Sequence, residues 1–120
     1  MADARFPVET VGGVPVVVTP EEIDITNAGG LREALLEAAG RGPGGFVVDM
    51  SRTEFCDTAG IHALVLAHKR AGAQGSEVRL VIAGAAVLRI FAVTGLDDVI
   101  SHFASLEEAL AATSGSTEGS

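Results

Sequence analysis

The sequence predicts a single α/β domain in which an N-terminal β-hairpin is followed by alternating helices and strands. Two short apolar segments are joined by Gly12-Gly13, later segments alternate between helical periodicity and short apolar runs, and glycine-rich breaks separate them. Because strands that alternate with helices pair in parallel through right-handed crossovers, we expect a mixed sheet with helices packed on it. The 120 residues are 48% hydrophobic with neither Trp nor Tyr, so one aliphatic core is expected.

The N-terminal third begins with two predicted strands, residues 6–11 and 14–19, joined by a tight turn at Gly12-Gly13. After Pro20, residues 21–25 alternate between polar and apolar side chains. This alternation predicts that Ile23 and Ile25 lie on one face and Asp24 on the other.

A first helix is expected from a cap at Thr26 or Asn27 to about residue 39. Its expected buried side chains are Leu31, Leu35 and Ala38. Residues 40–45 are glycine-rich and predict a loop, and the apolar run at residues 46–50 predicts a strand buried on both faces.

The second half predicts a loop at residues 51–56, a helix over 57–73 and a buried strand over 78–82. Helical spacing gives the 57–73 helix an inner stripe of Ile61, Leu64, Val65 and His68. A third helix, about residues 86–94, is expected to bury Leu88 and Phe91 and to end at a left-handed Gly95.

The C-terminal segment predicts a short strand over residues 99–103 and a last helix. Ser105 and Glu108 form a capping box for this helix, which is expected to end near Thr113. We therefore expect one domain over residues 1–113 and a disordered tail over 114–120, where the side chains are small and polar.

The charge balance argues against several classes of function. Sixteen acidic residues against eight basic ones give a net charge of −8, which repels phosphate backbones and argues against direct nucleic-acid binding. No apolar stretch approaches the roughly 20 residues of a membrane span, and the N-terminus lacks the apolar region of a signal peptide. With a single cysteine, Cys56, no internal disulfide can form, and we expect a cytoplasmic protein.

The least ordinary segment is residues 46–60, where a buried strand leads through a loop to Asp57-Thr58-Ala59-Gly60 at a helix start. A phosphate on Thr58 would lie near unpaired helix N–H groups and would add a charge of about −1.5 to −2. Alternatively, Asp57 or Thr58 serves only as a helix cap. The two roles are compatible, with Asp57 capping and Thr58 presented to a kinase.

One face of the same helix carries Thr58, His62, Leu66 and Lys69, at steps of four, four and three residues. If Leu66 is exposed, this face forms a modest docking surface. The alternative is that Leu66 packs at the edge of the sheet while His62 and Lys69 are solvated. The sequence does not decide between these two interpretations.

In three segments the sequence resembles the STAS domains, and within them the stand-alone anti-sigma factor antagonists of bacteria. Residues 16–31 resemble the family's strand, Glu-Ile-Asp turn and first helix. Residues 47–61 resemble its strand, Asp-Ser-Ser-Gly loop and second helix, and residues 80–96 its fourth strand and third helix. The likeness extends over about residues 6–112, and Asp-Thr-Ala-Gly after a strand is its most specific part.

The resemblance implies a single STAS-like α/β domain that works in a cycle of phosphorylation. The unmodified protein binds an anti-sigma factor, usually a serine/threonine protein kinase, and so frees the sigma factor. The kinase phosphorylates the hydroxyl after the Asp, here Thr58, and the complex dissociates, while a PP2C-type, metal-dependent phosphatase restores the binder. Asp24 matches the family's second acidic position beside this site.

The expected partner-binding surface combines these residues with the helix face described above. Its members are Asp24, Asp57, Thr58, Ala59, Gly60, His62, Leu66 and Lys69.

The sequence departs from the family pattern at the site itself. Thr58 replaces the commoner Ser, Ala59 removes a second hydroxyl, and Pro20-Glu21 replaces the usual Gly before Glu-Ile-Asp. Cys56, next to the site, is expected to be a small buried hydrophobic residue, with redox sensing as the alternative.

The alternatives are of two classes. Within the same fold, the chain would be an accessory module of a transport system or a sensor of a small ligand, without phosphorylation. As an enzyme it would be a small phosphatase with an Asp nucleophile, because Asp49-Met50-Ser51-Arg52-Thr53 comes at the end of a buried strand, but the second acid of such sites is missing. No catalytic residue, cofactor or metal is expected, since His62 and His68 point apart on their helix.

Overall fold

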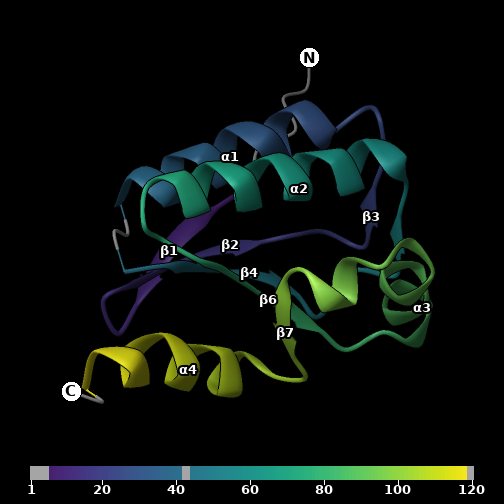
Figure 1. The fold of residues 1–120 in the computed structure, drawn as a ribbon. Coiled ribbons are helices and arrows are strands. Elements are labelled where there is room, and N and C mark those ends of the chain that lie inside the picture. The colour runs from purple at the N-terminus through teal and green to yellow at the C-terminus, as the bar shows by residue number, and fades with distance from the viewer. Residues whose placement is uncertain (1–5, 42–43, 119–120) are drawn as a thin grey trace.

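The N-terminal hairpin forms as the two glycines predict. A computed structural model describes residues 6–41 and 44–118 of the chain, and Figure 1 shows how its elements are arranged. Strand β1 (Val8–Val11) pairs antiparallel with β2 (Val14–Val18), and Gly12 and Gly13 both take positive φ, 59° and 84°. Both turn residues therefore have the backbone of a primed hairpin turn, which glycine adopts without strain.

A five-stranded mixed sheet forms the centre of the domain, in the order β1-β2-β4-β6-β7. Strands β4 (Phe46–Met50) and β6 (Val78–Ile82) have the predicted bounds, whereas β7 is limited to Ser101–Phe103. Strands β2, β4, β6 and β7 run parallel to one another, and only β1 is antiparallel, in its pairing with β2. The predicted mixed α/β sheet is confirmed.

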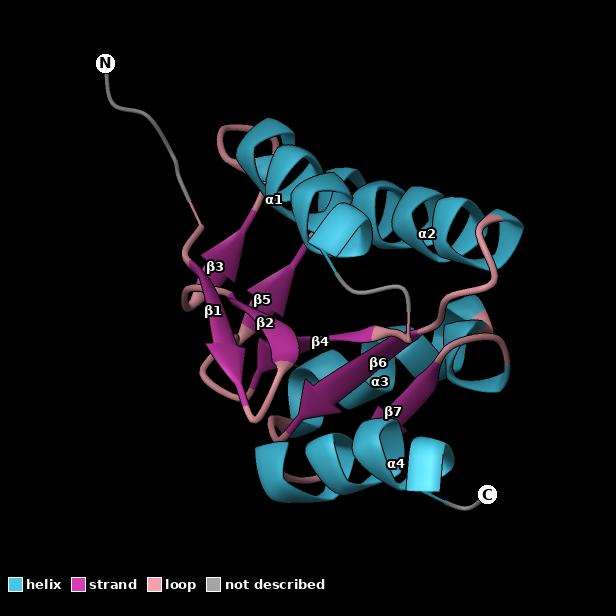
Figure 2. Cartoon of the chain, turned by 90° about the vertical axis from the view of Figure 1, so that its left-hand side faces the viewer, coloured by secondary structure: helices cyan, strands magenta, loops and turns pink. Residues whose placement is uncertain are grey.

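Helices cover both faces of this sheet, as Figures 1 and 2 show. Helices α1 (Ala28–Arg41), α2 (Thr58–Ala73) and α3 (Ala85–Thr94) contribute to the larger core with one face of the strands. Helix α4 (Leu106–Glu118) packs on the other face over Val16, Val47 and Val81. The short 3-10 helix η1 (Leu96–Asp98) connects α3 to β7.

A second, smaller sheet was not anticipated. Residues 51–56 were expected to form a loop, but Phe55–Cys56 form strand β5, which pairs in parallel with β3 (Glu22–Ile23). Buried hydroxyl groups join the segments that lead into this sheet. Thr19 Oγ1 and Thr53 Oγ1 are 2.6 Å apart, and Thr53 Oγ1 donates to the Pro20 carbonyl at 2.6 Å.

Three burial predictions are wrong. Ile25 does not share the inner face with Ile23, because β3 ends at Ile23 and the following turn leaves Ile25 78% exposed. On α3, Val87 packs inward with Phe91, while Leu88 is 37% exposed. On α2, His68 is only half-buried, because the inner face is rotated toward small residues that allow α1 to approach closely. These small residues are Ala63, Ala67 and Ala71.

The last helix continues beyond its predicted end at Thr113. The capping box forms, with the Glu108 N–H donating to Ser105 Oγ at 3.2 Å, although the Glu108 carboxylate accepts from the Ala104 N–H. Helix α4 then extends to Glu118, over residues for which we expected disorder, because extending a helix is far easier than starting one. Residues 119–120 lie outside the described part of the chain.

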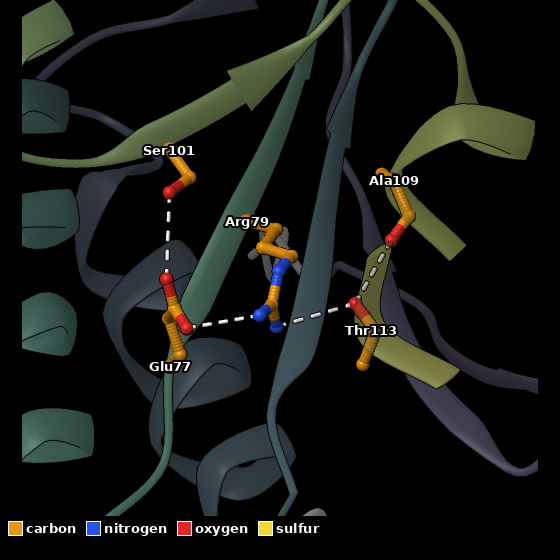
Figure 3. Close-up of polar contacts among 5 residues, drawn as sticks. All are labelled: Glu77, Arg79, Ser101, Ala109 and Thr113. Carbon is orange, nitrogen blue, oxygen red and sulfur yellow. Dashed lines mark hydrogen bonds and ion pairs between the residues drawn. The ribbon is translucent and has the colours of Figure 1, made fainter. Parts of the chain in front are cut away.

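A polar network fixes α4 to the sheet at the amino ends of β4 and β6 (Figure 3). The Arg79 guanidinium donates to Glu77 at 2.9 Å and to Thr113 Oγ1 at 3.4 Å. Glu77 also accepts from Ser101 Oγ at 3.4 Å.

No helix in the part of the chain described by the structure is long and apolar enough to cross a membrane.

The packing between α1 and the rest of the core can be tested at adjacent leucines. Leu35→Ala removes a fully buried side chain and should lower the free energy of unfolding by about 2–5 kcal/mol. Leu36→Ala, at a half-buried position of the same helix, should cost clearly less. Urea unfolding followed by circular dichroism measures both, and equal losses would contradict the inward orientation of Leu35.

Candidate functional site

The pairing of β3 with β5 places Asp24 and Asp57 at the same edge of the small sheet. Ile23 and Cys56 are register partners, so the two aspartates directly follow paired residues. The Asp57 N–H donates to the Ile23 carbonyl at 3.0 Å. Two acids that are far apart in the sequence therefore lie on neighbouring chain segments, next to the start of α2.

Asp57 is the N-cap of α2, as one of the two interpretations of this segment required. Its backbone is extended, with φ −90° and ψ −175°, and its Oδ1 accepts from the Ala59 N–H at 2.9 Å and the Gly60 N–H at 3.3 Å. Thr58 is the first residue of the helix and is exposed. The cap and a presented hydroxyl therefore occur together.

This cap changes the expected surroundings of a phosphate on Thr58. We expected the phosphate to benefit from the unpaired N–H groups of the first turn, but Asp57 already accepts from the N–H groups of Ala59 and Gly60. A phosphate on Thr58 would instead lie beside the carboxylate of Asp57, where like charges repel. Its main effect at this position would be to add negative charge to the surface.

Asp24 is held in a tight turn between β3 and α1. Its Oδ1 accepts from both the N–H and the hydroxyl of Thr26, and its own N–H donates to Asn27 Oδ1 at 2.9 Å. The Asn27 side chain also donates to the Glu22 carbonyl at 2.9 Å, so it ties the turn together. The hydrogen bonds from Thr26 lower the pKa of Asp24, which keeps this carboxylate charged.

Gly60 is buried where α2 crosses the small sheet. A Cβ at this position would come within 2.6 Å of both Cys56 Sγ and Ile23 Cγ2, two buried side chains of the β3–β5 pair. Glycine is therefore required for the start of α2 to lie this close to the small sheet. Although we expected Gly60 to contact a partner, the structure gives it a packing role.

Cys56 is a buried hydrophobic residue, as expected, with an exposed fraction of 2%. Burial, with a smaller contribution from the charge of Asp57, raises the pKa of its thiol to about 12. Redox sensing requires an accessible thiolate, so the structure disfavours this alternative.

The outer face of α2 has the predicted composition. His62 and Lys69 are exposed, and Leu66 is half-buried, so Leu66 is neither fully presented nor packed in the core. Ala59 is also half-buried. This face extends from the exposed Thr58 along the helix, and it is polar with one partly accessible leucine.

Sequence reasoning missed Phe55, which is 47% exposed although it is a large aromatic residue. Its position depends on the pairing of β5 with β3, which is non-local, so no pattern within residues 51–56 signals it.

Among residues 6–41 and 44–118, no group of three or more His, Cys, Asp or Glu side chains is arranged to hold a metal ion.

Comparison with known proteins agrees with the fold. The family model of the STAS domain matches residues 5–109. The anti-sigma-F factor antagonist RsfB of Mycobacterium tuberculosis is 31% identical over 103 residues, which cover 86% of this chain and 84% of that protein. The chain belongs to the STAS domain family, which confirms the resemblance found in the sequence.

Solved structures give the same result. The crystal structure of an anti-sigma factor antagonist from Mycobacterium paratuberculosis matches with a TM-score of 0.81 and 30% identity, over 90% of this chain and 92% of that one. The anti-sigma factor antagonist SpoIIAA in its unphosphorylated form matches with a TM-score of 0.76 over 92% of this chain and 96% of that one. At 21% identity, SpoIIAA shares the fold.

The close approach at Gly60 predicts that an added methyl group is harmful there. Gly60→Ala should lower the free energy of unfolding by about 1–3 kcal/mol, because the new Cβ overlaps Cys56 and Ile23. Gly72→Ala is the matched control in the same helix, since its Cβ meets nothing within 4 Å, and it should be neutral or stabilising by up to about 1 kcal/mol. Thermal or urea unfolding measures both variants; a stabilised Gly60→Ala would refute the contact.

Because the Cys56 thiol is buried, its reactivity should depend on unfolding, and the stability of the fold should depend on pH. At pH 8 Cys56 should not react with a thiol-specific reagent until urea unfolds the chain. Above the ordinary thiol pKa of 9.0, the unfolded state loses a proton that the folded state keeps up to a pKa of about 12. Stability should therefore fall as the pH rises through this range, and less so in Cys56→Ala; rapid labelling of the folded protein would contradict the burial.

Proposed function

We propose that this chain is a non-enzymatic anti-sigma factor antagonist of the cytoplasm whose binding is switched off by phosphorylation of Thr58. The unmodified form binds an anti-sigma factor of the serine/threonine-kinase type and thereby releases the sigma factor. A PP2C-type phosphatase would restore the binding form. The proposal takes its class of function from the two antagonists that are at least 30% identical to this chain.

The observation that carries the proposal is the geometry of Thr58. Its hydroxyl is on an exposed residue at the first position of α2, and the preceding Asp57 fixes the helix start through two hydrogen bonds. A kinase thus meets an acceptor hydroxyl on a rigid, accessible element. Asp24 and Asp57 lie on adjoining segments and already make this region negative.

The proposed switch has a simple electrostatic basis. In the transfer, the γ-phosphorus of ATP forms a bond to Thr58 Oγ1, its bond to the β-phosphate bridging oxygen breaks, and the hydroxyl proton passes to a base of the kinase. The new phosphate is then held between the remaining diphosphate and the carboxylate of Asp57. Repulsion of about 4 kcal/mol at this point would weaken the complex about a thousandfold.

Phosphorylation of Thr58 can be tested with the purified chain, ATP and an anti-sigma factor kinase of the same organism. Intact mass should show one added phosphate on the wild type and on Thr10→Ala, which removes an exposed hydroxyl on β1. Thr58→Ala should remain unmodified yet bind the kinase, whereas Thr58→Glu should bind at least about tenfold more weakly. Isothermal titration measures the binding.

Two outcomes would count against the proposal. Phosphate on Thr58→Ala would place the acceptor elsewhere. A wild-type chain that neither binds nor is modified by any such kinase would leave the transport-module and ligand-sensor alternatives, which a thermal-shift screen with small ligands addresses.

A further inference from the structure

The β3–β5 sheet has an outer face that is open to solvent at the exposed residues Glu22 and Phe55. Glu22 and Phe55 are register partners and point outward, while Ile23 and Cys56 point into the core. The alternation of a strand puts the extended Asp57 on the same side as Phe55. Figure 2 shows the two strands side by side, at the edge of the molecule beside α1 and α2.

Phe55 is fixed in this face although nearly half of it is exposed. Its N–H and that of Glu54 both donate to the Glu21 carbonyl, at 3.1 and 2.7 Å. An aromatic side chain on a rigid strand loses little freedom on binding and brings a large apolar area into an interface. Phe55 is therefore well suited to be the central anchor of a binding surface.

The segments that carry this face are strongly acidic. The charged residues of the segments 21–24 and 52–57 are Glu21, Glu22, Asp24, Arg52, Glu54 and Asp57. Five of the six are acids, and none of these five forms an ion pair within the part of the chain described here. A surface that is apolar at its centre and acidic at its rim complements one that has an apolar pocket with a basic rim.

We infer that the outer face of β3–β5, with Phe55 at its centre, docks on a basic surface of the anti-sigma factor. The inference rests on the proposed function and extends its site beyond Thr58 and α2. The Phe55 ring enters an apolar pocket, and lysine or arginine side chains around this pocket face Glu22 and Glu54.

Attraction at this face and repulsion at Thr58 are compatible, because the two act on different parts of the partner. The phosphate on Thr58 faces the nucleotide that donated it, whereas Phe55 and Glu22 lie on the preceding strands. Charges at the rim mainly raise the rate of association, while crowding at the phosphate raises the rate of dissociation.

The inference is tested with the anti-sigma factor that binds the wild-type chain in the experiment on Thr58. Phe55→Ala should weaken binding at least about tenfold, and Phe55→Leu should recover part of this loss because it keeps an apolar anchor. Val93→Ala is the control, since Val93 is an exposed apolar residue on α3. Melting curves verify that each variant is folded.

A second measurement addresses the charges. The double variant Glu22→Gln/Glu54→Gln should associate about threefold or more slowly at low ionic strength, and the difference should disappear near 1 M salt. Glu107→Gln, an exposed acid on α4, should behave as the wild type.

The outcomes separate the two proposals. If the wild type binds and folded Phe55→Ala and the double variant bind equally well, the docking face is wrong while the proposed function stands. If the wild type does not bind any anti-sigma factor, the proposed function itself fails, and the inference fails with it.

Discussion

The parallel pairing of β3 with β5 is the constraint on which the site depends. Each strand has only two residues, yet the pair brings Asp24 beside Asp57 and sets the start of α2. Gly60 lets this helix approach the pair closely, and the buried hydroxyls of Thr19 and Thr53 join the segments that lead into the two strands. Short strands are marginal by themselves, so this sheet owes its stability to the core behind Ile23 and Cys56.

Features with a strong local signal could be predicted from the sequence. The glycines at 12, 13 and 95 take the positive φ values that their positions indicated, and the two central strands begin and end where their apolar runs do. The N-cap at Asp57 is equally local, because its carboxylate reaches N–H groups only two and three residues ahead. Such features depend on a few neighbouring residues and little on the rest of the fold.

The remainder depends on contacts that the sequence pattern does not contain. The pairing of Phe55 with Glu22 joins residues far apart in the chain, so a segment that looked like a loop became a strand. Periodicity correctly indicated helix α3 but did not determine which of its faces is buried. In the structure Val87, rather than Leu88, joins Phe91 in the core. At Ile25, the turn made by Asp24 and Asn27 ended an alternation that the sequence pattern alone would have continued.

The position of α4 also affects how the domain can be joined to other parts of a protein. The helix packs on the face of the sheet opposite α1 and α2, and the network of Arg79 and Thr113 holds it near the amino end of β4, whereas Thr58 follows the carboxyl end of that strand. In Figure 1 the end of α4 and the start of α2 lie at opposite corners of the molecule. A polypeptide attached after α4 would begin on the side of the domain that is remote from the Thr58 surface. The fold can thus be carried as a module whose Thr58 surface stays open to solvent.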